Sequence, residues 1–312
     1  MNHSYGRLIA NSLASHRPHT GKQFFLLGSS HANWEELSEM FPVGPEGKTR
    51  VFTDLQSALN STETGGDDII FIAPGYTENI TAAADIDINN THVSIIGLGE
   101  GDQKPTFTFT TATTADLNVD AAGVSFENIR FDLTGIDALV APLDINAASC
   151  TFRNCDFITA DASGQCVNAI LTDANADNML IDGCDFIGSQ LGGTTSAVRI
   201  VGGDDIIIKN SHFIGNYKVS AGAIEVTTTA AGNLRIENNT ILNTTLASTV
   251  AVNFATGTTA IVVGNVLGIR SGSTPVRVNE DQVVGTGARG GYILVGRNYF
   301  RADTEPVAGT LL

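Results

Sequence analysis

The sequence predicts an all-β chain that folds as a single-stranded parallel β-helix of about eight coils, each 26 to 32 residues long. Three observations predict this fold. A short motif, apolar-x-apolar-x-Asn-x-x-apolar, recurs along the chain at that narrow period, a second alternating run precedes most copies, and no helix-length apolar pattern lies between them. Such repeats are typical of solenoids, in which each unit stacks on the one before it.

The motif occurs eight times. Its fifth position falls on Gly97, Asn128, Asn154, Gly183, Asn210, Asn238, Asn265 and Arg297. The second run has the form small-apolar-x-apolar and lies at 142–145, 197–200, 223–226, 251–254 and 275–278. Each period therefore holds at least two short strands with one face inward. The missing helix pattern excludes βαβ units, and the lack of regularly spaced leucines excludes a leucine-rich horseshoe. A propeller is excluded as well, because each of its blades needs about 40 residues.

Stacked coils place equivalent positions about 4.8 Å apart, which is the spacing of neighbouring strands. The third motif position then forms one interior stack, made of Phe126, Phe152, Ile181, Ile208, Ile236, Val263 and Val295. The eighth position forms another, made of Phe131, Phe157, Phe186, Phe213, Ile241 and Phe300. Asn at the fifth position marks a sharp bend, where its side chains form a ladder. Glycine replaces Asn in two copies because it tolerates the backbone angles of the bend.

The composition excludes several classes of protein. The 312 residues carry a net charge of −16, which excludes a protein that neutralises nucleic-acid phosphates. Hydrophobic residues make up 42 % of the chain, which is enough for a core. No apolar run reaches the roughly 18 residues of a membrane span, and no secretory signal is readable. Neither the four cysteines nor the six histidines have metal-site spacing, so we expect no metal, no cofactor and no disulfide framework.

Residues 49–81 are expected to close the N-terminal end of the solenoid. Thr53 and Gln56 form a capping box, so that 54–61 is a short helix covering the open sheet edge. The order of an "LQSAL" helix, a "GGD" turn, an "IIFIAPG" strand and a "Y-x-E-x-I" segment resembles the entry of the pectin-lyase-like family. The resemblance covers about 51–300 and implies a right-handed β-helix. It does not imply one activity, because that family contains enzymes, binders and virion proteins.

Residues 1–50 are expected to form an arm and leader outside the repeat, and 301–312 a C-terminal tail. The first 34 residues carry +3, so the remainder carries −16 − 3 = −19. Two interpretations stay open: a frayed tail, or an arm that docks on a partner of complementary charge. The candidate partner-binding residues are Tyr5, Arg7, Leu8, Ile9, Leu13, Arg17 and Lys22.

The segment 21–59 adds a second resemblance. Its short apolar strand, "ANWEEL" helix, Phe41-Pro42 and "GPEGKTRVF" turn resemble the leader of β-helix proteins encoded among the structural genes of tailed bacteriophages. This resemblance implies a capsid decoration or cement protein, made in the host cytoplasm, that docks on the major capsid protein at the virion surface. By analogy with proteins at the symmetry axes of a shell, we expect a homotrimer. No nucleic-acid or membrane partner is expected.

Catalytic candidates come from the seventh motif position, which reads Arg130, Asp156, Asp185 and His212. Stacked about 4.8 Å apart, Asp156 and Asp185 would couple and His212 would shuttle protons, as in a glycosidase-like pair. The alternative is an outward ladder in which the basic residues bracket the acids. The fourth position favours this alternative, since it alternates in charge through Glu127, Arg153, Asp182, Lys209 and Glu237.

The motifs of catalytic β-helices are missing. No paired aspartates are followed by Gly-His-Gly and Arg-Ile-Lys, no cluster of acids with an outward Arg stands out for calcium, and the coil lengths leave no insertion to wall a cleft. We therefore expect that the chain is not an enzyme. Two other classes stay open: a phage tailspike or receptor-binding β-helix that binds or cleaves a host polysaccharide, and a cellular adhesin.

Overall fold

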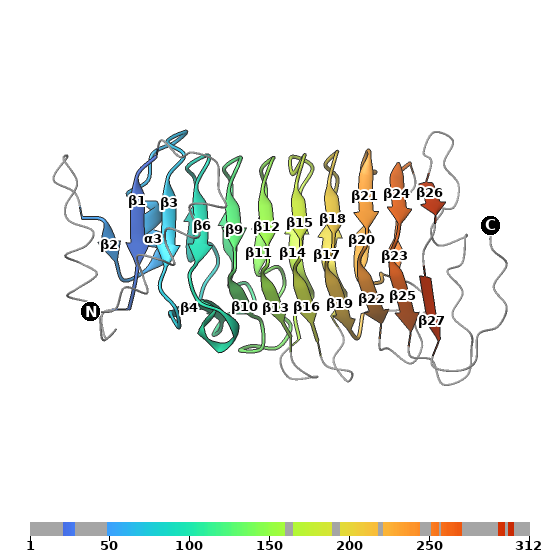
Figure 1. Cartoon of the computed structure of the whole chain (residues 1–312), viewed down its shortest axis with the longest axis horizontal. Helices are drawn as coiled ribbons and strands as arrows, with labels where there is room; N and C mark the ends of the chain where they lie inside the picture. Colours follow the sequence, from blue (N-terminus) through green and yellow to red (C-terminus); the bar gives the residue numbers. More distant parts are fainter. Residues whose placement is uncertain are drawn as a thin grey trace.

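The computed structural model confirms an all-β parallel solenoid of about eight turns (Figure 1). It describes residues 21–28, 49–159, 165–188, 194–217, 221–243, 251–255, 257–269, 293–296 and 299–302. Within these ranges three parallel sheets, here called A, B and C, run along the solenoid, and a complete coil adds one strand to each in that order.

Sheet A contains, in spatial order, β2 (Val51–Phe52), β1 (Gln23–Leu26), β3 (Ile69–Ile72), β6 (Ser94–Gly97), β9 (Ser125–Glu127), β12 (Thr151–Arg153), β15 (Leu180–Asp182), β18 (Ile207–Lys209), β21 (Leu234–Glu237), β24 (Ala260–Val263) and β26 (Ile293–Gly296). Sheet B contains β4 (Thr77–Ile80), β7 (Thr106–Phe109), β10 (Arg130–Asp132), β13 (Asp156–Ile158), β16 (Asp185–Ile187), β19 (His212–Gly215), β22 (Thr240–Asn243), β25 (Val266–Ile269) and β27 (Tyr299–Ala302). Sheet C contains β5 (Ile86–Ile88), β8 (Leu117–Val119), β11 (Leu143–Ile145), β14 (Asn168–Thr172), β17 (Ser196–Ile200), β20 (Ile224–Val226) and β23 (Val252–Asn253).

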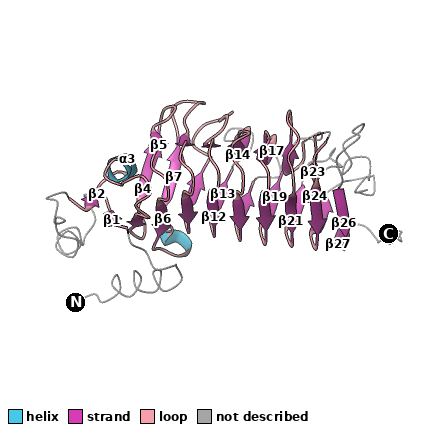
Figure 2. Ribbon diagram, turned by 90° about the horizontal axis from the view of Figure 1, so that it is seen from above, coloured by secondary structure: helices cyan, strands magenta, loops and turns pink. Residues whose placement is uncertain are grey.

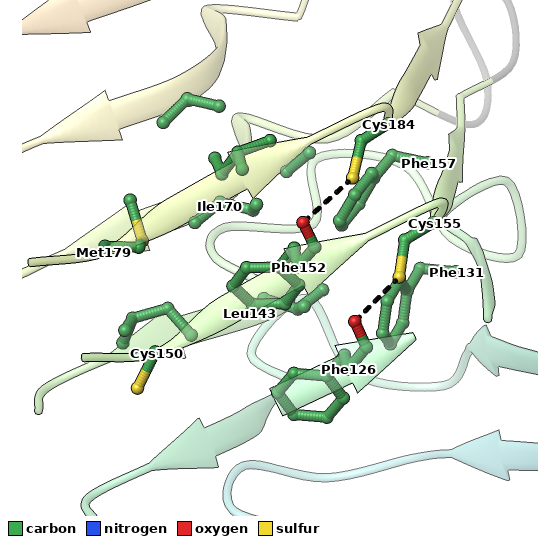
Figure 3. Close-up of a cluster of buried hydrophobic side chains, with 14 of the residues drawn as sticks. Phe126, Phe131, Leu143, Cys150, Phe152, Cys155, Phe157, Ile170, Met179 and Cys184 are labelled. Carbon is green, nitrogen blue, oxygen red and sulfur yellow. Dashed lines mark hydrogen bonds between the residues drawn. The ribbon is translucent and has the colours of Figure 1, made fainter. Parts of the chain in front are cut away.

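The predicted interior stacks form where the strands of sheets A and B align. Phe126 pairs in register with Phe152, and their rings lie 5.0 Å apart and almost parallel. In the second stack the rings of Phe157 and Phe186 lie 4.3 Å apart at an angle of 3°. These side chains are at most 2 % exposed, so each coil buries its aromatic rings against the next coil (Figure 3).

One copy of the motif is shifted by a residue from its predicted register. Val262, not Val263, pairs with Ile236 and faces the interior at 3 % exposure. The bend residue of this copy is therefore Gly264, with φ +71°, and not Asn265. The prediction was wrong here because two adjacent valines satisfy the apolar pattern equally well in either register.

The bend between sheets A and B is left-handed, as the fifth position predicts. Asn128, Asn154, Asn210 and Asn238 have φ between 50° and 58°. The amide of Asn154 donates to the Oδ1 of Asn128, which begins the expected ladder. Gly97 is the exception, because it is not left-handed. A Cβ there would lie 2.1 Å from the carbonyl oxygen of Asn128, so close backbone approach requires this glycine.

Cys155 and Cys184 follow this bend in neighbouring coils and are fully buried as free thiols (Figure 3). Each sulfur contacts a carbonyl oxygen of the preceding coil, that of Phe126 for Cys155 and that of Phe152 for Cys184. The other two cysteines are also free and buried. The thiols therefore act as small core side chains.

The N-terminal end is closed by α3 (Leu55–Leu59), which Figure 2 shows beside β1, β2 and β4. The cap differs from the predicted capping box: Asp54 is the N-cap, and its Oδ1 accepts a hydrogen bond of 2.8 Å from the Ser57 amide. Gln56 instead bonds the backbone of Asp87 through both its amide atoms. β1 lies within residues 1–50, which were expected outside the repeat, and it pairs with β3 to extend sheet A.

Candidate functional site

Asp156, Asp185 and His212 are aligned on the outer face of sheet B. Asp156 pairs in register with Asp185, and Asp185 with His212, so the strands β13, β16 and β19 bring the three predicted residues into one column. The alternation of each strand places the neighbouring Phe side chain inward and these polar side chains outward.

Asp156 is engaged in ion pairs with two cations. Its Oδ1 lies 2.6 Å from Lys104 Nζ, and its Oδ2 lies 3.3 Å from Arg130 Nη2. The Lys104 side chain is 8 % exposed and also donates to the carbonyl oxygen of Asn154. A buried lysine needs such a counter-ion, so Asp156 holds the turn around Gly101–Gln103 against sheet B.

Asp185 and His212 are the two candidates that meet. The Oδ1 of Asp185 lies 2.7 Å from the Nδ1 of His212, and their side chains are 42 % and 56 % exposed. A carboxylate that orients an imidazole is a common acid–base arrangement, but both groups stand in solvent, where such pairs contribute little to stability. The column therefore divides into a buried ion pair at Asp156 and an exposed pair at Asp185.

A second column lies on the outer face of sheet C, and the sequence analysis did not single it out. In register it reads Asp87, Asn118, Asp144, Leu171, Arg199, Glu225 and Asn253. Each of these residues is partly exposed and stands between two buried neighbours in the chain. The signal was present, since in four of the five small-apolar-x-apolar runs the x residue belongs to this column; the fifth run, 275–278, lies outside the described residues.

The amides of this column are hydrogen-bonded to its carboxylates. Asn118 Nδ2 donates to Asp120 at 2.9 Å and to Asp87 at 3.4 Å. Asn146 Nδ2 donates to the Oδ1 of Asn118 at 2.8 Å and to Asp120 at 3.1 Å. This network orients the acidic side chains of three successive coils along one face.

The charge on sheet C is not balanced as it is on sheets A and B. Five aspartates gather over its N-terminal half: Asp87, Asp116, Asp120, Asp144 and Asp173. The single cation of the aligned column, Arg199, lies 3.7 Å from Glu225 in the other half. We call this surface, from Asp87 to Asp173, the acidic face.

Two carboxyl groups of the acidic face have raised pKa values. Partial burial raises the pKa of Asp144 above its ordinary value, and the negative charges of Asp116, Asp173 and Asp120 raise it further, against a hydrogen bond from Asn146. Burial and the charge of Asp87 likewise raise the pKa of Asp116. Raised carboxyl pKa values on one surface are typical of acid–base sites.

The acidic face and Arg199 lie on the same outer side of sheet C, with Arg199 beyond the aspartates and beside Glu225. The chain nevertheless shows no metal centre: in the described ranges, no three acidic, histidine or cysteine side chains are grouped closely enough to hold an ion. No described helix is long and apolar enough to cross a membrane.

The predicted docking arm lies mostly outside the described residues, which begin at Gly21. Tyr5, Arg7, Leu8, Ile9, Leu13 and Arg17 belong to that part. Lys22 is described, and it is held on the solenoid: its ammonium group lies 2.5 Å from Glu63, and its backbone amide donates to Asp68.

No family model matches the chain, and no curated protein matches it. Three solved structures resemble it. A pectate lyase from Bacillus sp. N165, in complex with trigalacturonate, has 13 % identity and a TM-score of 0.57, with 95 % of this chain and 87 % of that chain covered. The tailspike of E. coli bacteriophage HK620 has 13 % identity and a TM-score of 0.42, with 84 % and 56 % covered. An alginate lyase from Paenibacillus sp. FPU-7 has 12 % identity and a TM-score of 0.28, with 80 % and 96 % covered.

The pectate lyase overturns the expectation that the chain is not an enzyme. In that protein the same fold, matched over 95 % of this chain, carries a lyase, so the regular coil lengths are no ground for excluding catalysis. At 13 % identity the match shows the fold alone and transfers no residue role. The chain has the right-handed parallel β-helix fold of the pectate lyase.

Proposed function

We propose that the protein binds a polysaccharide on the acidic face of sheet C and cleaves it by acid–base catalysis, with Asp144 as the proton donor. The observation that carries this proposal is the placement of Asp144, which is aligned between neighbouring coils, where partial burial and then three other carboxylates raise its pKa. The pectate lyase of the same fold holds an oligosaccharide, trigalacturonate, which supports a carbohydrate ligand for this scaffold.

The charge of the acidic face selects an uncharged polysaccharide. Carboxylates accept strong hydrogen bonds from sugar hydroxyl groups. The same carboxylates repel a polyuronate, and the aligned column offers one cation, Arg199, which is already paired with Glu225. The parallel strands present their polar side chains in a straight row, which suits an extended chain of sugars.

The chemistry needs two carboxyl groups with different protonation. Asp144, whose pKa is raised, donates its proton to the glycosidic oxygen as the bond to the anomeric carbon breaks. Asp87 lies two strands away, about 9.5 Å by the strand spacing, and takes a proton from the attacking water. That separation is at the upper end of the ~6.5–9.5 Å that leaves room for water in inverting hydrolysis. The products are two shorter glycans, with one water consumed.

The test measures new reducing ends released from a panel of uncharged glucans, galactans and mannans, with polygalacturonate beside them. We expect cleavage of an uncharged polymer and a loss of about 100-fold or more in Asp144→Asn, with binding retained. Asp182→Asn on sheet A is the matched control, since it makes the same change on another outer face. Full activity of Asp144→Asn, or loss of activity in Asp185→Asn alone, would place the site elsewhere.

We propose capsid decoration as a second function, supported by the charge contrast between the first 34 residues, at +3, and the remaining −19. A basic arm on an acidic body favours docking on an acidic or mixed surface such as that of a major capsid protein. Deleting residues 1–20 should then abolish association with phage capsids and leave the circular dichroism of the solenoid unchanged. Undiminished capsid binding by the shortened chain would rule out the docking arm.

A further inference from the structure

The outer face of sheet A carries two columns of side chains on β12, β15, β18 and β21, which stand side by side along the solenoid in Figure 1. In each strand the residue that points into the core is buried, and the residues on either side of it point outward. In register, the first column reads Thr151, Leu180, Ile207 and Arg235, and the second column reads Arg153, Asp182, Lys209 and Glu237. All eight residues are at least partly exposed, so this face is open to contact.

Arg153 is a cation that the described part of the chain leaves without a partner. It pairs in register with Glu127 on one side and with Asp182 on the other. Its guanidinium group nevertheless makes no hydrogen bond or ion pair with a described residue. Asp182 is engaged instead by Lys209 Nζ at 3.4 Å and by the side-chain amide of Asn210 at 2.8 Å. The charge of Arg153 is therefore available to a carboxylate from outside this column.

Glu237 offers such a carboxylate at the other end of the column. The Nε and Nη2 of Arg235 both donate to its Oε1, at 2.9 Å and 2.7 Å. Its Oε2 accepts no hydrogen bond from the described residues. Within one chain Arg153 and Glu237 are three strand spacings apart, about 14 Å, so they cannot pair with each other.

A second copy of the chain can bring these two groups together. Sheets that pack face to face lie about 10 Å apart. A two-fold axis parallel to the strands keeps each column opposite itself and reverses the order of its coils. With this axis midway between β15 and β18, Arg153 meets Glu237 of the second copy, and Asp182 meets Lys209 of the second copy. The symmetry repeats both contacts, so the second column is complementary to itself in this register.

The first column fits the same register. Leu180 lies opposite Ile207 of the second copy at the axis, so apolar side chains meet at the centre and ion pairs flank them, as in other interfaces. An axis one coil nearer the N-terminus would still oppose unlike charges. It would put Leu180 opposite Thr151 and Ile207 opposite Ser125, which removes the apolar centre.

Other two-fold arrangements of this face are unfavourable. An axis that passes through β15 would place Asp182 against Asp182 of the second copy, and like charges in contact repel. An axis parallel to the solenoid would place the first column against the second. Leu180 would then meet Asp182, and Ile207 would meet Lys209, so charged groups would lose water to apolar side chains.

We propose that this face of sheet A joins two copies of the chain in an antiparallel dimer. The strands here have three or four residues, so the contact is small. Interfaces that bury less than about 1,200 Å² are typical of weak, transient complexes. The dimer should therefore form at high protein concentration and weaken with added salt. The proposal does not depend on the polysaccharide site, which lies on sheet C.

The register is tested by mixing two variants that each add one surface cysteine, Arg153→Cys and Glu237→Cys. In the proposed dimer these two positions face each other, whereas the two copies of either position are about 14 Å apart along the solenoid. The mixed dimer keeps its other Arg153–Glu237 pair. With a short bis-maleimide crosslinker we expect roughly fivefold more crosslinked dimer in the mixture than in either variant alone. The native cysteines are buried, so the wild-type chain should give none.

Glu127→Cys mixed with Arg153→Cys is the matched control. It makes the same change in the same column, but in this register position 127 lies about 19 Å along the solenoid from position 153 of the second copy. This mixture should crosslink no more than its components. Equal crosslinking in the two mixtures overturns the proposal, and so does the lack of any excess in the mixture of Arg153→Cys and Glu237→Cys.

Sedimentation velocity of the full chain over a range of concentrations gives a second measurement. We expect a monomer–dimer equilibrium that is roughly tenfold weaker in Arg153→Gln, since each dimer loses two ion pairs. Arg199→Gln makes the same change on sheet C and should leave the equilibrium unchanged. A wild-type chain that stays monomeric at high concentration, or that forms trimers, overturns the proposal.

Discussion

The ammonium nitrogen of Lys104 lies 2.6 Å from the Oδ1 of Asp156, although 52 residues separate them in the chain. Both side chains are largely buried, and Arg130 approaches the other carboxylate oxygen. This contact links a turn of one coil to a strand two coils further on. It assigns Asp156, a catalytic candidate by sequence position, to the stability of the solenoid.

Asp156→Asn should therefore destabilise the protein strongly. It leaves the ammonium group of Lys104 buried without its counter-ion, a change that costs about 3–5 kcal/mol in the free energy of unfolding. Urea denaturation measures the loss. Asp182→Asn is the control, because its partner Lys209 is 35 % exposed and such pairs contribute about 1 kcal/mol or less. Equal losses in the two variants would contradict the structural role.

The acidic face should make stability fall as pH rises. The folded-state pKa values of Asp144 and Asp116 are raised, so between the unfolded and folded values the native state binds more protons than the unfolded state. Stability is therefore lost as pH rises through the folded pKa values. Asp144→Asn has no carboxyl group to titrate at this position, so the variant does not share this loss. Above about pH 4, the unfolded pKa of Asp, its free energy of unfolding should therefore rise relative to that of wild type. Urea midpoints compared across pH check this, and a constant difference between the two proteins would contradict it.

Two glycines at equivalent bend positions should respond differently to alanine. Gly97→Ala places a Cβ 2.1 Å from the Asn128 carbonyl oxygen, and we expect a loss of more than about 3 kcal/mol or no folded protein. Gly183→Ala meets nothing within 4 Å and costs only its left-handed backbone, about 1–2 kcal/mol. Thermal or urea unfolding measures both. Gly183→Asn should cost less than Gly183→Ala, because Asn holds the same bend in the neighbouring coils.

The four thiols should be unreactive in the native protein. All are buried, and burial raises the pKa of Cys150 to about 11 and that of Cys166 to about 12, so the reactive thiolate is scarce at neutral pH. Titration with a thiol reagent should give no fast reaction in the folded state and four equivalents in urea. Fewer than four equivalents in urea without reductant would indicate a disulfide between Cys155 and Cys184.

The parts of the fold that repeat could be predicted from the sequence. Phe157 and Phe186 stack as the eighth motif position predicts, because a short motif that recurs in every coil allows one alignment of neighbouring coils. Where the local pattern was ambiguous, the prediction failed. The paired valines at 262 and 263 fit two registers, and Thr53 and Asp54 are both good helix caps.

The candidate site was less predictable, because it combines residues whose neighbours are not periodic. Asp116, Asp120 and Asp173 lie in the connections between strands, where coil lengths vary, so their approach to Asp144 cannot be read from the motif. Leu171 interrupts the polar column in the middle of sheet C and obscures it further.

The sequence by itself determined the coil period, the residues that face inward and the left-handed bends, because these depend on alternation and backbone preference within a few residues. The tertiary structure alone decided which outward charges are paired. Asp156 and Asp144 occupy similar outward positions on their strands. Lys104 and Arg130 reach Asp156 from earlier coils, whereas Asp144 is surrounded by carboxylates from other coils. Charge interactions depend on distance in space and not along the chain, so only stacking separates a carboxylate paired with two cations from one whose pKa is raised by burial and by neighbouring carboxylates.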